Sequence, residues 1–282
     1  MVIRGKKLAD NPMQKIHKEL SFPRVFTDAR GATITLNQPP ERIVSLVPSQ
    51  TEMLAALGLE DEVVGITRFC VHPSTWKQSK VIVGGTKNVN VERVQALSPD
   101  LILANKEENT REDIERLEAI APVYVTEVST LSDALEMIRT VGWLTAREAQ
   151  SEALIGKIRY AFKELPDFEK RRALYLIWRK PYMSVGGDTF IHEMMQYAGF
   201  ENVMAFWQRY PEVSLEQMRT LNPEVVLLAS EPYPFKAKHV EELREWVPQA
   251  RIVLVDGELF SWYGSRLQYA PAYFKYLRQE IA

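Results

Sequence analysis

The chain has 282 residues, of which 46% are hydrophobic and 26% charged, and its net charge is −2. This composition predicts a packed globular core, and the length suits two modest domains. It excludes several classes of protein. No apolar run reaches the roughly 20 residues of a membrane-spanning helix, and there is no basic field for nucleic acid. A single cysteine, Cys70, excludes a disulfide framework and an all-cysteine metal site.

Residues 1–22 are polar and aperiodic, and we interpret them as an N-terminal arm. The arm carries basic residues but lacks the apolar stretch that follows them in a signal peptide. If Met1 is the native start, a cytoplasmic protein is expected. If a leader has been replaced, the protein belongs outside the cytoplasm, and the sequence does not choose between the two.

The first half of the chain alternates strand and helix patterns. Residues 25–36 are typical of two short strands around a turn, and a buried strand is expected within 39–48. The next helix is expected to begin with a capping box of Ser49 and Glu52 and to end at Gly58. The elements expected after it are a strand at 61–67, a helix and strand over 90–105, a helix at 111–120 and a strand at 121–128. This alternation predicts an α/β fold with mainly parallel sheets flanked by helices.

Helical periodicity then dominates from Leu131 to Leu165. Thr145 and Glu148 form a second expected capping box, so a long helix is predicted at 146–166. Strand patterns return at 171–178, 181–187, 224–230 and 250–257, with a helix ending near Gly199. The predicted division is an arm (1–22), an N-terminal α/β lobe (23–145), a linking helix (146–166) and a C-terminal α/β lobe (167–282).

An internal repeat indicates that the two lobes are similar. NVERVQALSPDLILA (90–104) matches SLEQMRTLNPEVVLLA (214–229). Each has an N-cap residue, a glutamate in the first helical turn and a proline before a buried strand. A second pair, 49–65 and 187–203, shares a helix that ends in glycine and a return to valine. Two matches in the same order predict two lobes of one design with a ligand cleft between them.

These segments resemble the periplasmic binding proteins of ABC importers for vitamin B12, ferric siderophores and haem, which form the helical-backbone metal-receptor superfamily. The resemblance runs from about Phe22 to the C-terminus, includes PPERIVSLVPSQTEMLAALGLEDEVVGI and SWYGSRLQYAPAYF, and is nearest to the cobalamin-binding members. It implies two lobes joined by one rigid helix with limited closure. It also implies a monomer of the periplasm or cell envelope, with no catalytic role and no intrinsic cofactor. The implied ligand is a corrinoid or a related metal chelate such as a ferric siderophore.

The resemblance also implies how the protein meets its membrane partner. Glu92 and Glu216 match two family glutamates, one on each lobe, that meet arginines of the ABC permease. Two carboxylates placed in this way give a two-point register onto a symmetric partner. Each glutamate is equally explained as an acid favoured in the first turn of a helix by the helix dipole.

The cleft is expected where loops follow the C-terminal ends of the strands in both lobes. Aromatic loop residues interleaved with arginine suit a flat macrocycle with charged groups at its edge. The predicted ligand-binding residues are Ser49, Gln50, Arg68, Phe69, His72, Lys87, Trp178, Arg179, Tyr210, Trp262, Tyr263 and Arg266. Tyr210 stands where the cobalamin-binding relatives have a cleft tryptophan, but Thr86 replaces a second one, which leaves corrinoid specificity open.

Cys70, His72 and His192 are weak candidates for metal ligands, because their spacing matches no established motif and structural histidines fit as well. Cys70 and His72 are also a conceivable nucleophile and base, without the geometry to establish it. We therefore predict the solute-binding protein of an ABC importer rather than an enzyme. Two alternatives stay open: a haem or free-metal receptor that uses His72 and His192, and a cytoplasmic carrier or sensor that has left transport.

Overall fold

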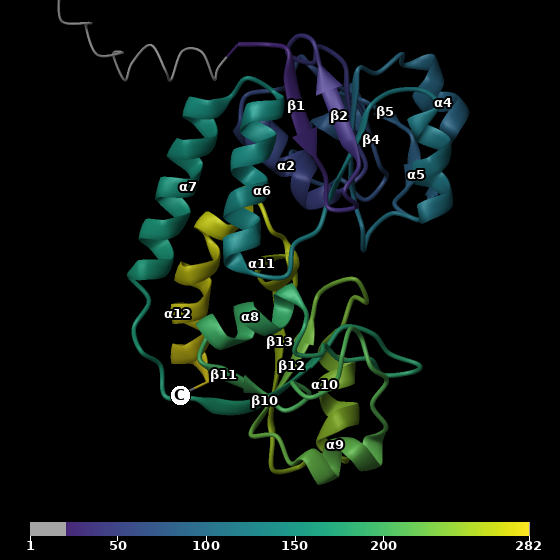
Figure 1. Cartoon of the computed structure of the whole chain (residues 1–282). Helices are drawn as coiled ribbons and strands as arrows, with labels where there is room; N and C mark the ends of the chain where they lie inside the picture. Colours follow the sequence, from purple (N-terminus) through teal and green to yellow (C-terminus); the bar gives the residue numbers. More distant parts are fainter. Residues whose placement is uncertain (1–20, 282) are drawn as a thin grey trace, which may run out of the picture.

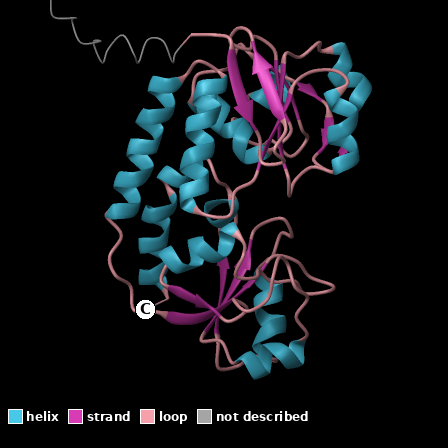
Figure 2. Cartoon of the chain, in the orientation of Figure 1, coloured by secondary structure: helices cyan, strands magenta, loops and turns pink. Residues whose placement is uncertain are grey.

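The computed structural model describes residues 21–281, so almost all of the predicted arm (1–22) lies outside the described residues. Strands gather into an upper and a lower group, and a set of long helices runs along one side of both groups (Figure 1, Figure 2). Within residues 21–281, no helix combines the length and the apolar character that crossing a membrane requires.

The first lobe is built on a parallel five-stranded sheet in the order β5-β4-β3-β8-β9. Its strands are β3 (Ile43–Ser45), β4 (Val63–Ile66), β5 (Val81–Ile82), β8 (Leu101–Asn105) and β9 (Val123–Thr126). Its helices are α2 (Pro48–Ala56), α3 (Trp76–Ser79), α4 (Val91–Ala96) and α5 (Arg111–Glu118). Two antiparallel hairpins join it, β1 (Arg24–Thr27) with β2 (Thr33–Leu36) and β6 (Gly84–Gly85) with β7 (Asn88–Val89).

The second lobe is built on a parallel four-stranded sheet in the order β11-β10-β12-β13. Its strands are β10 (Arg171–Leu176), β11 (Phe200–Asn202), β12 (Val225–Ala229) and β13 (Arg251–Val255). Its helices are α8 (Phe190–Tyr197), α9 (Leu215–Leu221), α10 (Ala237–Arg244), α11 (Glu258–Ser261), the 3-10 turn η1 (Ser265–Gln268) and α12 (Ala270–Glu280). The α6 (Leu131–Leu144) and α7 (Glu148–Lys163) helices lie between the two lobes in the chain.

The predicted repeat is confirmed by the topology, because β4-β3-β8-β9 and β11-β10-β12-β13 have the same order and direction. The two sheets even begin in the same way. In the first lobe the Asp100 carboxylate accepts the backbone N–H of Arg42 at 3.0 Å. In the second the Glu224 carboxylate accepts the backbone N–H of Arg172 at 2.8 Å. The two lobes are therefore built to one design, with loops leaving both sheets at equivalent edges.

One apolar core joins the two lobes. Alternate side chains of a strand point to opposite faces of its sheet. One face of each sheet packs under its own outer helices, and the side chains of the other face join a cluster common to both lobes. Its buried members include Leu103 of β8, Ile138 of α6, Ile158 of α7, Tyr175 of β10 and Phe274 of α12. Movement of one lobe against the other would disturb this core, so we expect the base of the molecule to resist such movement.

The α7 helix lies within the range 146–166 that was predicted for the linking helix, and it packs against α6 and α12 (Figure 1). It begins after Arg147, without the predicted capping box. The hydroxyl of Thr145 instead donates to the carbonyl of Val141 at 2.7 Å and so belongs to the end of α6. The limits predicted for the lobes stay predictions.

The capping box predicted for Ser49 and Glu52 is also wrong. The α2 helix begins at Pro48, with Val47 in the N-cap position and no side-chain cap. Proline suits the first helical position because its ring fixes φ and it has no N–H to satisfy. This start frees both side chains for other contacts, which matter at the site below. Gly58 has φ +76 and ends the helix as expected.

The strand predicted at 181–187 does not form. Met183 makes only isolated bridges, to Trp178 and to Glu212. Gly186 and Gly187 lie against the backbone of the following loop, and a Cβ on either would come within 2.3 Å of a carbonyl oxygen. The valine and glycine pattern therefore marks a close approach of two loops rather than a strand.

Candidate functional site

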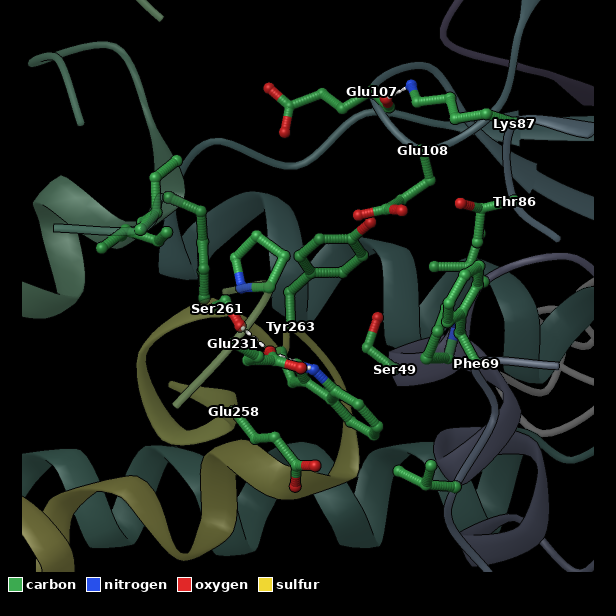
Figure 3. A pocket seen from close by; sticks show the side chains of 18 of the residues that line it. Ser49, Phe69, Thr86, Lys87, Glu107, Glu108, Glu231, Glu258, Ser261 and Tyr263 are labelled. Carbon is green, nitrogen blue, oxygen red and sulfur yellow. Dashed lines mark hydrogen bonds between the residues drawn. The ribbon is translucent and has the colours of Figure 1, made fainter. Parts of the chain in front are cut away.

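A cleft of about 670 Å³ opens between the two lobes (Figure 3). It lies where the loops leave the C-terminal ends of the parallel strands, as predicted for open α/β sheets. Eight of the predicted ligand-binding residues line it, namely Ser49, Arg68, Phe69, Lys87, Trp178, Tyr210, Trp262 and Tyr263. Thr86 also lines the cleft, facing it from the turn between β6 and β7.

The other four predicted residues, Gln50, His72, Arg179 and Arg266, do not line the cleft. Gln50 is fully buried beneath it, where its amide donates to the hydroxyl of Thr126. Arg179 forms an ion pair with Glu242 of α10 at 2.6 Å. This carboxylate holds the pKa of Arg179 above its usual value and keeps its charge away from the cleft. Sequence could not reveal these partners, because they come from distant segments.

His72 and Arg266 instead support Trp262. The edge of the His72 ring meets the indole at 5.6 Å between centroids, and the Arg266 guanidinium lies 5.1 Å from it. The indole N–H donates to the Glu231 carboxylate at 2.7 Å. Contacts on three sides fix the orientation of this aromatic side chain, so it presents a pre-arranged apolar surface to the cleft.

A network of charges below Trp262 ties the lobes together. Arg266 of the second lobe pairs with Glu52 of α2 in the first lobe at 2.8 Å and with Glu258 of α11 at 2.8 Å. Glu258 is in turn 3.0 Å from the imidazole of His72. This network stands at the base of the cleft, beside the shared apolar core.

Four glutamates line the cleft, and none of them is among the ligand-binding residues predicted from the sequence. They are Glu107 and Glu108, which follow β8, Glu231, which follows β12, and Glu258, which begins α11 after β13. Burial raises the pKa of Glu108 and of Glu231. Each follows a buried strand at the edge where the cleft was expected. That position is the signal in the sequence that points to them, whereas the residues predicted for the cleft are aromatic, polar or basic.

The mouth of the cleft is closed by a contact between the two lobes. The Tyr210 hydroxyl donates to the Glu107 carboxylate at 2.9 Å, and the Arg209 guanidinium pairs with the same group. Burial and this carboxylate raise the pKa of Tyr210, so its hydroxyl stays protonated. The backbone N–H of Arg209 donates to the Asp188 carboxylate at 2.6 Å. The contact of Arg209 and Tyr210 with Glu107 depends on the position of their loop, which packs closely against the backbone at Gly186.

The basic side chains of the cleft, Arg68, Lys77 and Lys87, all come from the first lobe. The Arg68 guanidinium lies 5.9 Å from the ring of Phe69. Aromatic side chains come from both lobes. The cleft can therefore hold a flat ligand whose edge meets both carboxylates and basic side chains.

The weak metal-ligand candidates do not come together. Cys70 is buried against the hydroxyls of Thr51 and Thr67, and burial raises the pKa of its thiol. Nδ1 of His192 is 3.2 Å from the amide of Asn202. Across residues 21–281, no group of three or more metal-ligating side chains has the geometry to hold an ion.

Glu92 and Glu216 lie exposed in the first turns of α4 and α9. These helices stand at the outer parts of the upper and the lower lobe (Figure 1). Bonds from its own backbone N–H and from the Ser214 hydroxyl lower the pKa of Glu216, so this carboxylate is charged.

Comparison with known proteins gives consistent matches. A sequence profile described as periplasmic binding protein matches residues 43–249. An uncharacterised ABC transporter substrate-binding lipoprotein of Bacillus subtilis is 29% identical, over 87% of this chain and 82% of its own. The vitamin B12-binding protein of Vibrio parahaemolyticus is 31% identical, over 67% of this chain and 71% of its own.

Among solved structures, a periplasmic heme-binding protein of Roseiflexus superposes with a TM-score of 0.75. It is 21% identical, over 86% of this chain and 98% of its own. This likeness concerns the fold alone. Since proteins named for cobalamin and for haem share the architecture, the ligand has to be argued from the residues that line the cleft.

Proposed function

This chain belongs to the periplasmic binding protein family, whose members bind small-molecule ligands for ABC transporters, and we propose that its own ligand is a cobalamin-like corrinoid held between the lobes. The prediction made from the sequence was a corrinoid or a related chelate such as a ferric siderophore, with a haem or free-metal receptor and a cytoplasmic carrier or sensor as the alternatives. Support comes from a relative of 31% identity that is named for vitamin B12 binding and from the chemistry of the cleft.

The observation that carries the proposal is the set of four carboxylates among the aromatic side chains of the cleft. A corrinoid is a flat macrocycle whose edge bears amide groups, and their N–H donors match carboxylate acceptors. The periphery of haem bears two carboxylates. These would meet four carboxylates against three basic side chains, Arg68, Lys77 and Lys87, in the cleft, so the balance of charge opposes them. The cleft therefore favours a corrinoid over haem.

A haem receptor that uses His72 is the second candidate, because a haem-binding protein shares the fold. His72 is bonded to Glu258 and packs against Trp262, and it does not line the cleft. Axial ligation of haem iron by His72 would require both contacts to break. We therefore place haem second.

The test is isothermal titration calorimetry with cyanocobalamin, haemin and ferrichrome. We expect a one-to-one complex with cyanocobalamin at micromolar or lower Kd, and binding of haemin that is weaker by about tenfold or more. Trp262→Ala should weaken cyanocobalamin binding by about a hundredfold, since it removes the fixed aromatic surface. Trp143→Ala, at an exposed position on α6, is the matched control. Tighter binding of haemin or ferrichrome than of cyanocobalamin would overturn the choice of ligand.

Delivery to a permease is the second half of the proposed function, with Glu92 and Glu216 as the two docking carboxylates. Their exposure and their equivalent places on α4 and α9 support it. The double variant Glu92→Gln/Glu216→Gln should keep its affinity for cyanocobalamin and lose binding to permease in reconstituted vesicles. Glu112→Gln, in the first turn of α5, should keep both. Unchanged permease binding by the double variant would leave the two glutamates as ordinary helix-start acids.

A further inference from the structure

A second hollow of about 550 Å³ adjoins the cleft on the first lobe. Arg68 and Lys87 line both spaces, so one continues into the other. Beyond these two residues the hollow runs past Arg93 at the start of α4 and Arg116 on α5. We call this hollow the basic groove.

The charges of the basic groove are unbalanced. Four basic side chains line it, against one carboxylate, that of Asp113. Asp113 already accepts the backbone N–H of Val89 at 3.1 Å and lies 3.7 Å from the guanidinium of Arg116. One buried carboxylate cannot neutralise four cations, so the groove carries a net positive charge.

Two of the arginines are available to an incoming anion. Over residues 21–281, the Arg68 guanidinium has no hydrogen bond or ion pair, and its contact is with the ring of Phe69. The Arg93 guanidinium donates to one backbone carbonyl, that of Ile82, at 2.9 Å, and has no carboxylate partner there. A guanidinium with open donors is the group that pairs best with a phosphate, because two N–H donors match two phosphate oxygens.

The groove and the cleft thus differ in charge on either side of Arg68 and Lys87, the two residues that they share. The cleft has an excess of carboxylates and suits an uncharged or cationic macrocycle, whereas the groove suits an anion. We infer that the basic groove binds a phosphate-bearing appendage of the same ligand whose macrocycle occupies the cleft. This inference rests on the proposed function, and a corrinoid with a phosphodiester-linked nucleotide has these two parts.

The test compares two corrinoids by calorimetry: cyanocobalamin, which carries the phosphodiester, and dicyanocobinamide, which lacks it. The wild type should bind cyanocobalamin about tenfold more tightly, as expected for two or more partly exposed charge pairs. In Arg93→Gln/Arg116→Gln, which changes only the groove, that preference should fall to about twofold, with dicyanocobinamide affinity unchanged. Arg111→Gln, an exposed change on the same helix that does not line the groove, should keep the full preference.

Equal affinity of the wild type for both corrinoids overturns the inference and leaves the proposed function standing. An equal loss for both corrinoids in the double variant also overturns it, because the groove would then act on the cleft rather than on the phosphate. If neither corrinoid binds, the proposed function fails. Titration with inorganic phosphate, followed by NMR, then tests whether the basic groove is an anion site. Saturable shifts of the Asn88 and Thr110 amide resonances, absent from the double variant, would support an anion site, and their absence would overturn it.

Discussion

The lobes meet at two places, the base and the mouth of the cleft, and the two contacts differ in burial. At the base, Arg266 and Glu52 keep only 16% and 18% of their side chains exposed, beside an apolar core common to both lobes. At the mouth, Arg209 keeps 48% of its side chain exposed and its partner Glu107 keeps 24%. An exposed ion pair is worth about 0 to 1 kcal/mol, and breaking a buried one costs several times more. The base therefore holds the lobes in place, and the mouth is the contact that can open.

The largest effect is expected from the shared core. Ile158→Ala on α7 removes a fully buried side chain from the core and should lower the free energy of unfolding by about 3 to 4 kcal/mol. Tyr160→Ala, on the same helix with its side chain 67% exposed, should change it by less than about 0.5 kcal/mol. Denaturant unfolding measures both. Similar losses for the two variants would show that the core does not stabilise the base.

The charge network at the base should rank next. Arg266→Gln removes the arginine that pairs with Glu52 and Glu258, while Glu258 keeps its contact with His72. The change also removes one support of Trp262. We expect a loss of about 2 kcal/mol in the free energy of unfolding and about tenfold weaker cyanocobalamin binding, mainly through faster dissociation. Denaturant unfolding and stopped-flow kinetics measure the two. Wild-type kinetics in a destabilised variant would remove Arg266 from the support of the ligand surface.

At the mouth the expected effect is kinetic. Arg209→Gln breaks the exposed pair with Glu107, so stability should change by less than about 1 kcal/mol. Opening becomes easier, and the association rate of cyanocobalamin should rise about threefold in stopped-flow fluorescence, a modest change typical of interface variants. A slower association rate would mean that Arg209 attracts the ligand rather than closing the mouth.

The smallest effect concerns pH. Burial raises the pKa of Glu231 above its unfolded value, so the folded state binds this proton more readily. Its stabilising effect is complete below the unfolded pKa and is lost as pH rises through the folded pKa. Glu231→Gln keeps an acceptor for the Trp262 N–H and removes the charge. The variant should be slightly more stable than wild type at neutral pH, with the gain vanishing in acid. Thermal unfolding at a series of pH values measures this difference in stability. A gain in stability that grows in acid would contradict the raised pKa of Glu231.

Much of the fold and the location of the site could be predicted from the sequence. Hydrophobic periodicity indicates which residues are buried, and the internal repeat indicates that the two lobes share one topology. Together they predict where the strands end and which loops line the cleft. Partners could not be predicted in the same way. Glu52 and Arg266 are 214 residues apart, and local patterns carry no information on contacts of that range. The prediction that Arg179 binds ligand was wrong for the same reason, because Arg179 pairs with Glu242 of α10, 63 residues away.

The carboxylates were missed for a different reason. Glu107, Glu108 and Glu231 follow buried strands at the expected edge, but the ligand predicted from the sequence had an edge that pairs with arginine and lysine. A residue that directly follows a parallel strand lies at the cleft whatever its charge. The charges found there then indicate which chemical groups the ligand carries.

The most direct test of the rigid base is the distance between the two lobe tips with and without ligand. Spin labels at Glu92→Cys and Glu216→Cys, in a Cys70→Ser background, would stand on α4 and α9. Pulsed electron spin resonance then gives the distance distribution before and after saturation with cyanocobalamin. Two lobes that share one core should give distributions that coincide within the spread of the labels. A distinct second distance that appears with ligand would contradict the account and make the base a hinge.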